Sequence, residues 1–230
     1  MAPKRSARRG KEGEAGGYAT ETHEWKSSKC SDFDLLGLVE EHLLQSRNMV
    51  HWRRSDGESP PHEGLNESVV FHPHVLQGLG FPISDFFRGL LHHWGVQVHH
   101  LTPNSILHIL IFVHLCEAFL GIKPHFILFQ YFFHLKPHPN ESKIDVVGGT
   151  GLQFRQGKKP QYIPYELSAK VIDWKEMWLY VRNLSSSFPL RTPGPPVKKS
   201  SWNSKGSGGD QVNFLQIGRA SCRERVFEAV

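Results

Sequence analysis

The chain has 230 residues, of which 39% are hydrophobic and 21% are charged, and its formal net charge is +5 with a pI of about 9.1. This apolar content is sufficient for one folded domain, and the length leaves room for long polar flanks. A basic balance permits nucleic acid or acidic proteins as partners. Many ordinary domains share it, so charge alone assigns no function.

The three cysteines, Cys30, Cys116 and Cys222, are far apart and form no CxxC pair. This spacing argues against a zinc ribbon, a zinc knuckle or a disulfide scaffold, and it favours reduced thiols. No apolar stretch follows the basic N-terminus, so we expect no secretory signal and an intracellular protein, with nucleus and cytoplasm both open. Residues 1–30 are expected to be a disordered basic tail, and a nuclear-import or nucleic-acid-binding signal is the alternative.

Order is expected to begin at Ser31, which resembles the start of a capping box completed by Asp34. Apolar residues at helical spacing then predict a helix over 31–46. The turn-rich segment 53–65 predicts a loop. Residues 67–71 are consistent with a short strand or with a lead into a helical turn.

Three helices are expected next, each with a clear start signal. Ser84 suits the N-cap of the first, which Gly95 can end in a left-handed conformation. Thr102, followed by a proline, suits the start of the second, which Gly121 closes. A third is expected over 124–135, again after a proline.

These helices form one apolar block over about 84–135. From residue 96 to residue 135 the only Asp, Glu, Lys or Arg residues are Glu117 and Lys123. A helix that is apolar nearly all round is either buried or in a membrane. The run 106–122 is shorter than the roughly 20 residues of a bilayer span and contains two histidines. We therefore predict a buried core and no membrane segment.

The pattern changes after the third helix. Residues 143–147, a glycine-rich turn and residues 152–154 predict a small β-hairpin. Residues 162–165 and 178–181 are candidate strands, and 171–177 is ambiguous between helix and strand. The predicted fold class is therefore α+β and predominantly helical, with a small β-hairpin region after the helix core and disordered termini.

The C-terminal part is not expected to fold. Residues 184–216 are rich in Pro, Ser, Gly and Lys and have no core-forming pattern, so we predict a disordered linker. Residues 217–226 resemble the conceptual translation of a sequencing adapter. We therefore expect 217–230 to be an adapter-derived tail.

Histidines offer the only candidate site. Four of them lie in the segment His92–His100, and others follow. His108 and His114 are six residues apart, which places them about 120° from one another on a helix, so they cannot share a metal. A metal-dependent hydrolase or nuclease using His92–His100 is the alternative function, although no supporting carboxylate is evident. We predict structural histidines instead.

Other catalytic patterns are incomplete. Gly151 and Gly157 are separated by five residues and no Ser or Thr follows Lys159, so the stretch is not a phosphate loop. Cys116 lies among apolar neighbours and is expected to pack as a small hydrophobe. The motifs of retroelement proteases, reverse transcriptases and integrases are missing. We predict no catalytic, cofactor-binding or metal-binding residues, and a protein that is not an enzyme.

Three strings carry a family resemblance: GLGFPISDFFRGLLHHWG, HHLTPNSILHILIFVHLCEAFLGI and IDVVGGTGLQF. Through them residues 38–183 resemble the gypsy-type transposon domain of plant proteins, and we expect the whole domain to span 31–183. The resemblance implies a retrotransposon origin and supplies no catalytic residues. With the basic charge, it suggests a structural or nucleic-acid-associated role, with nucleic acid or other retroelement proteins as partners. The oligomeric state stays open.

Overall fold

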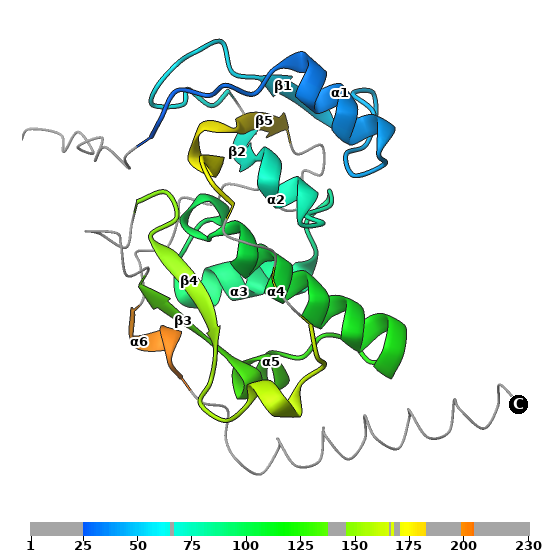
Figure 1. Cartoon of the computed structure of the whole chain (residues 1–230), viewed down its shortest axis with the longest axis vertical. Helices are drawn as coiled ribbons and strands as arrows, with labels where there is room; N and C mark the ends of the chain where they lie inside the picture. Colours follow the sequence, from blue (N-terminus) through cyan, green and yellow to red (C-terminus); the bar gives the residue numbers. More distant parts are fainter. Residues whose placement is uncertain are drawn as a thin grey trace, which may run out of the picture.

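The computed structural model describes residues 25–64, 67–137, 146–165, 167, 171–182 and 199–204. These residues form a mixed α+β fold with a three-stranded and a two-stranded sheet, so the predicted α+β class is confirmed. In Figure 1 the three-stranded sheet lies at the top, and the two-stranded sheet lies below it among most of the helices.

The three-stranded sheet is antiparallel, with strand order β1 (His51–Arg54), β5 (Trp178–Arg182), β2 (Glu67–Phe71). The strand β5 lies between two strands from a much earlier part of the sequence, and its backbone is hydrogen bonded to both. The candidate strand at 178–181 is confirmed. The predicted loop 53–65 is wrong at its start, because Arg53 and Arg54 belong to β1; pairing with β5 outweighs their polar pattern.

Both faces of β5 are buried. On one face Trp178 and Tyr180 pack into an aromatic cluster with Phe71 and Trp174. On the other face Leu179 and Val181, together with Val70, belong to the main core, while Arg182 at the end of the strand is exposed. A central strand that is covered on both sides needs apolar residues at every position, which is why the period-2 alternation is absent here.

The first helix, α1 (Asp32–Glu40), begins as predicted. Ser31 accepts a hydrogen bond from the amide of Asp34, whose carboxylate accepts one from the amide of Ser31, which completes the capping box. The predicted range 31–46 is too long. The helix ends at residue 40 because the amides of the next two leucines turn back to the Leu38 carbonyl.

After β2 the chain runs directly into α2 (His72–Leu76), so both interpretations of this segment are realised in succession. The next helix, α3 (Asp85–Trp94), has Ser84 as its N-cap and Gly95 at its end with a φ of 66°. Both boundaries were predicted.

The helix α4 (Pro103–His114) continues as a π-helical segment, η2 (Leu115–Leu120), and Gly121 ends it as predicted. Residues 103–120 together are long and apolar enough to cross a membrane by length and composition, and 39% of them are buried. A single helix of this kind is weak support for a membrane span, because a core helix of a soluble protein passes the same test.

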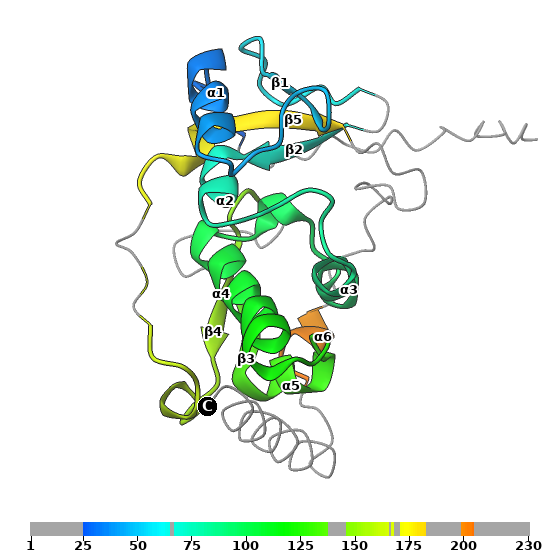
Figure 2. The same cartoon turned by 90° about the vertical axis from the view of Figure 1, so that its right-hand side faces the viewer.

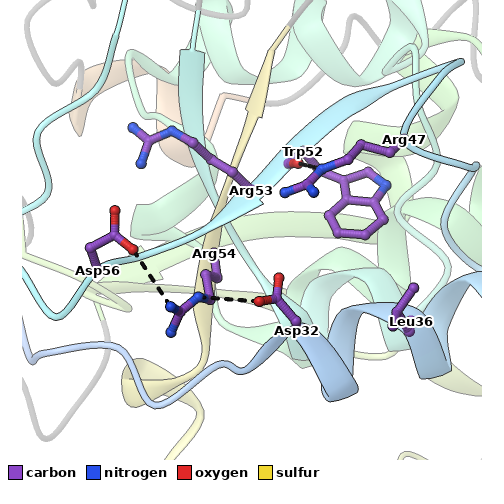
Figure 3. Close-up of a pocket in the computed structure, with 7 residues that line it drawn as sticks. All are labelled: Asp32, Leu36, Arg47, Trp52, Arg53, Arg54 and Asp56. Carbon is purple, nitrogen blue, oxygen red and sulfur yellow. Dashed lines mark hydrogen bonds and ion pairs between the residues drawn. The ribbon is translucent and has the colours of Figure 1, made fainter.

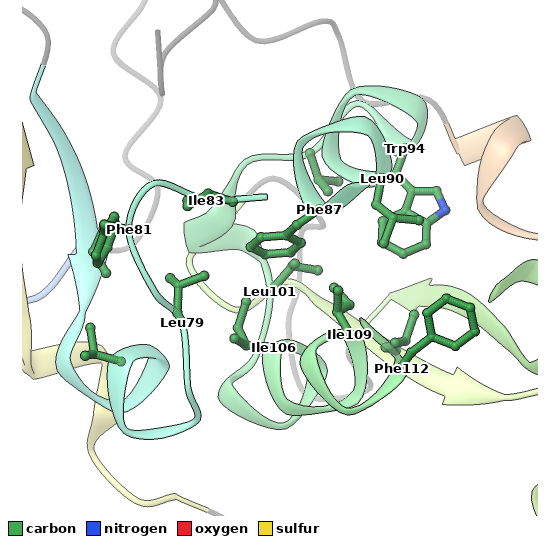
Figure 4. Close-up of a cluster of buried hydrophobic side chains, with 14 of the residues drawn as sticks. Leu79, Phe81, Ile83, Phe87, Leu90, Trp94, Leu101, Ile106, Ile109 and Phe112 are labelled. Carbon is green, nitrogen blue, oxygen red and sulfur yellow. The ribbon is translucent and has the colours of Figure 1, made fainter. Parts of the chain in front are cut away.

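One side of α4 lies in the main core of the fold. Figure 4 shows this side facing α3, whose buried side chains interdigitate with those of α4. The contacting residues drawn there are Phe87, Leu90 and Trp94 of α3, and Ile106, Ile109 and Phe112 of α4. This packing is the arrangement expected of a core helix.

The third predicted helix is shorter than 124–135. It forms α5 (Phe126–Phe132), and the chain then enters β3 (Phe133–Pro137). Burial alternates along β3, since Phe133 and Leu135 are buried and His134 between them is partly exposed. Alternation of period two favours a strand over a helix at this point.

A two-stranded sheet is present, but its first strand is not the predicted one. Strand β4 (Thr150–Phe154) pairs with β3, whereas the expected partner was 143–147. Val146 and Val147 lie in a turn, and residues 143–145 lie outside the described residues. The alternating pattern of β3, hidden at the end of an apolar helix, explains the error.

Two short 3₁₀ turns follow. The candidate strand at 162–165 is wrong, because these residues are irregular and follow η3 (Lys159–Gln161). The ambiguous segment 171–177 contains η4 (Trp174–Glu176).

The predicted disordered flanks contain two ordered pieces. Residues 25–30 lie against β5 and η4, with the Lys29 amide donating to the Glu176 carbonyl. Residues 199–204 include α6 (Lys199–Trp202), in which Trp202 is only 4% exposed. Disorder is therefore wrong for these two pieces. The rest of both flanks, including the predicted adapter-derived tail 217–230, lies outside the described residues.

Gly148 provides a test of the packing between the turn and the aromatic cluster. Its φ is +70°, and a Cβ at this position would lie 2.6 Å from Cζ2 of Trp174. Gly148→Ala is expected to destabilise the fold by about 1–3 kcal/mol, because it adds a left-handed backbone cost and forces a buried ring to move. Urea unfolding measures the change.

The matched control is Gly157→Ala. Gly157 has nearly the same φ, +72°, but no atom lies within 4 Å of its Cβ position. This variant should show only the backbone cost, about 1 kcal/mol. If both variants unfold at the same urea concentration, the close contact with Trp174 is wrong.

Candidate nucleic-acid interface

Arginines gather around β1 on the surface of the three-stranded sheet. Two adjoining open hollows, of about 390 and 520 Å³, lie beside this strand. We call this region the β1 arginine surface, and its basic residues are Arg47, Arg53, Arg54 and Arg182. Figure 3 shows the first hollow, with three of these arginines and Trp52 around it.

Arg47 is exposed and held by Trp52. Its guanidinium carbon lies 4.9 Å from the centre of the indole ring, and its Nε donates to the Trp52 carbonyl at 3.0 Å. The indole Nε1 in turn donates to the Gln45 carbonyl at 3.0 Å. Because the tryptophan is buried, it fixes the base of the arginine side chain while the charge stays near solvent.

Arg53 has a structural role. Its Nε and Nη2 donate to the two carboxylate oxygens of Glu67 at 2.9 and 2.7 Å, and its guanidinium lies 3.8 Å from the ring centre of Tyr180. The bond from Arg53 lowers the pKa of Glu67. A bidentate pair of this kind links β1 to β2 across β5 and leaves little freedom for a ligand.

The same network fixes the loop after β1. The Tyr180 hydroxyl donates to Glu58 at 2.7 Å and accepts from the His62 amide at 2.8 Å. Burial alone would raise the pKa of Glu58, but the bonds donated by Tyr180, by Ser55 and by the Asp56 amide lower it to about 2. Glu58 is therefore charged at neutral pH and acts as an anchor for the loop.

The other two arginines are more available. Arg54 lies 3.3 Å from Asp32 and 3.9 Å from Asp56, and all three side chains are more than half exposed. Exposed pairs of this kind contribute little and exchange partners readily. Within the described part of the chain, Arg47 and Arg182 form no ion pair at 4.0 Å or less.

Several apolar side chains of the segment from α1 to β1 are exposed, and one of them, Leu36, lines a hollow with the arginines. Phe33 and Leu36 of α1 are 85% and 51% exposed, and Met49 is 66% exposed. Leu36 and Asp32 line the hollow of Figure 3 together, one helical turn apart. Surfaces that bind single-stranded nucleic acid combine basic groups with exposed aromatic rings, and Phe33 lies on the same helix as Leu36.

The structure does not bring the histidines of 92–100 to one point. His92 is exposed at the end of α3, while His93 packs on the ring of Phe126. The rings of His99 and His100 meet edge to face, and the ring of His99 also lies against Trp25. Among the described residues no group of three or more His, Cys, Asp or Glu side chains could hold a metal. The histidine-based hydrolase is not favoured.

The remaining candidate groups are buried or differently folded. Cys116 is buried, as predicted, and so is Cys30. Burial raises the pKa of each thiol to about 12, so both are poor nucleophiles. The glycines near residue 150 lead into β4, whereas a phosphate loop leads into a helix.

Comparison with known families identifies part of the chain. Residues 69–137 match the model of the family described as "Putative gypsy type transposon". This segment of the chain is similar to a gypsy-type transposon domain. The match begins in β2, ends with β3 and so includes α2 to α5. No curated protein and no solved structure matches the chain.

The match defines which part of the fold the family describes. The matched segment supplies the helices α2 to α5, whereas β1, Arg47, Arg182 and α6 lie outside the matched residues. The β1 arginine surface is therefore a feature of this chain beyond the matched segment.

Two buried histidines predict how stability depends on pH. Burial lowers the pKa of His74 to about 3 and that of His108 to about 4. An unfolded histidine has a pKa near 6.5, so below this pH only the unfolded chain takes up protons. Stability should be full above about pH 6.5 and be lost as the pH falls toward 4 and then 3. Urea unfolding should show a loss of about 2–4 kcal/mol from pH 7.5 to 5.

Substitutions separate this effect from the titration of carboxylates. His108→Gln removes one of the two groups and should reduce the loss between pH 7.5 and 5. The exposed His92 offers a matched control, since His92→Gln should leave the loss unchanged. A stability that is flat over this interval would contradict the burial of both rings.

Proposed function

We propose that the chain is a non-enzymatic, nucleic-acid-associated module of a retrotransposon-derived protein. The β1 arginine surface is the proposed contact with the phosphate backbone. The observation that supports this most directly is the position of Arg47 and Arg182, two exposed cations without an ion pair in the described structure. These two arginines line one hollow together, and Arg47 also lines the adjoining hollow with the exchangeable Arg54. The retrotransposon origin follows from the family match of residues 69–137.

The chemistry of these residues suits phosphate. A guanidinium donates two parallel hydrogen bonds to phosphate oxygens and keeps its charge at any physiological pH. Arg54 can leave Asp32 and Asp56 for a phosphate at little cost, because that pairing is exposed to solvent. Arg53 stays with Glu67 and holds the strand that carries its neighbours.

Single-stranded nucleic acid is the proposed ligand. The exposed ring of Phe33 and the side chain of Leu36 offer an apolar contact for unstacked bases next to the arginines. Stacking of this kind tolerates any sequence, so we expect affinity without marked sequence preference. An intracellular location, in the nucleus or the cytoplasm, is part of the proposal, and the two buried free thiols suit a reducing compartment.

Fluorescence anisotropy with a labelled single-stranded oligonucleotide tests the proposal at rising salt concentration. The intact chain should bind in the micromolar range, with an affinity that falls as salt rises. Neutralising two arginines in Arg47→Gln/Arg182→Gln should reduce the slope of log affinity against log salt by about 1.4, at about 0.7 per lost phosphate contact. Duplex DNA of the same length should bind more weakly, because its bases cannot stack on Phe33.

Two controls make the result specific. Lys123→Gln/Lys136→Gln removes the same charge from exposed sites away from the three-stranded sheet and should keep the slope. Arg47→Lys/Arg182→Lys keeps both positive charges and should also keep most of the slope of log affinity against log salt. Equal loss in the two glutamine variants, or no salt-sensitive binding by a folded chain, would overturn the proposal. Tight binding of an acidic retroelement protein without nucleic-acid binding would reassign the surface to that partner.

A further inference from the structure

A second surface of the fold is covered by a short segment from the C-terminal part of the same chain. Residues 199–204, which we call the α6 segment, lie against the end of α3, beside β3 and α5 (Figure 2). The contacting side is formed by His93, Trp94, Gln130 and Arg155, and we call it the α3 groove.

The α6 segment completes the C-terminal end of α3. The last carbonyls of a helix have no partner within the helix. In α3 the amides of Gly95 and Val96 satisfy the carbonyls before His93. The next two carbonyls accept bonds from the α6 segment: Ser201 Oγ donates to the His93 oxygen at 2.7 Å, and Trp202 Nε1 donates to the Trp94 oxygen at 2.9 Å.

One aromatic side chain anchors the segment. Trp202 is 4% exposed and belongs to the main core, where Trp94 is also buried. A buried tryptophan whose indole N–H donates a hydrogen bond is the kind of residue that dominates the binding energy at interfaces. Its neighbours in the sequence are small and polar, so the anchor alone supplies the apolar contact.

Polar contacts then define the residues after the tryptophan. Gln130 Nε2 donates to Ser204 Oγ at 2.9 Å, and His93 Nε2 lies 3.3 Å from the same oxygen. Arg155 donates from Nη1 to Asn203 Oδ1 at 2.6 Å and from Nη2 to the Ser204 carbonyl. The groove residues therefore form hydrogen bonds with both the side chains and the backbone of a Ser-Trp-Asn-Ser sequence.

All groove residues are remote in sequence from their occupant. The four lie between positions 93 and 155, and sixteen residues (199 − 182 − 1) separate β5 from the α6 segment. None of the contacts described depends on that connection. A covalent link of this length raises the local concentration of the segment without changing the contacts that it makes.

We propose that the α3 groove is a peptide-recognition site, with the α6 segment of a second copy of this chain as its ligand in trans. The occupant in cis and the occupant in trans have the same sequence, so every contact above is available to both. The segment in cis then acts as a competitor that a neighbouring copy displaces at high local concentration. This site is independent of the β1 arginine surface.

A labelled peptide tests the proposal with the full-length chain. The probe is residues 197–206, VKKSSWNSKG, and the receptor is the Trp202→Ala chain, in which the cis competitor has lost its anchor. We expect saturable binding to this receptor and at least ten-fold weaker binding to the unchanged chain. The same peptide with alanine for its tryptophan is the matched control, and it should bind at least ten-fold more weakly.

Each outcome decides the matter. Equal binding of the two peptides, or no binding by a Trp202→Ala chain that still unfolds cooperatively, overturns the proposal. If Trp202→Ala does not fold, hydrogen–deuterium exchange on the unchanged chain replaces it. Excess peptide should then speed exchange at the amides of 201–204. Unchanged exchange at millimolar peptide would likewise overturn it.

Discussion

The insertion of β5 between β1 and β2 is the constraint on which the fold depends. No local connection brings this strand to its place, because it comes from the far end of the domain. It is held by backbone bonds on both sides and by the burial of Trp178 to Val181 on both faces. Bringing β5 back to β2 closes a long loop, which costs conformational entropy. The free energy gained by burying the side chains of β5 must outweigh that cost. The matched segment is thereby joined, through β2, to strands that lie outside the match.

The candidate interface follows from that strand. Arg53 lies opposite Tyr180 in the register, which sets its guanidinium on the ring and beside Glu67. With Arg53 fixed, Arg54 and the Trp52–Arg47 pair are presented at the edge of the sheet. Without β5 the surface would lack Arg182, which belongs to β5 itself, and Arg53 would lose the ring of Tyr180.

Local signals predicted much of the fold. The capping box at Ser31, the N-cap at Ser84 and the ending glycines at Gly95 and Gly121 depend on neighbours within a few residues, and all four stand where expected. Two elements that depend on distant partners, β1 and α6, were missed. The edge strand β1 has a polar sequence, and α6 has four residues with no periodicity, so neither could be found without its partner.

The candidate site was harder to predict than the fold. Histidines drew attention because they cluster in sequence, yet the fold sends them to different partners. Three of the arginines lie close together in the sequence, and the register of β1 and β5 adds the distant Arg182 to them. Two signals could have helped: the Arg pair directly after Trp52, and the lone Trp202 in an otherwise polar stretch. An isolated tryptophan in such a stretch often marks a docking residue.

Hydrogen–deuterium exchange of the full-length chain tests the position of β5 directly. Strand amides that are hydrogen bonded and buried on both faces open only with the global unfolding of the domain. We predict that the amides of residues 179–181 exchange as slowly as those of 109–112 in the core of α4. Rapid exchange of 179–181 alongside a protected α4 would show that β5 is not the central strand.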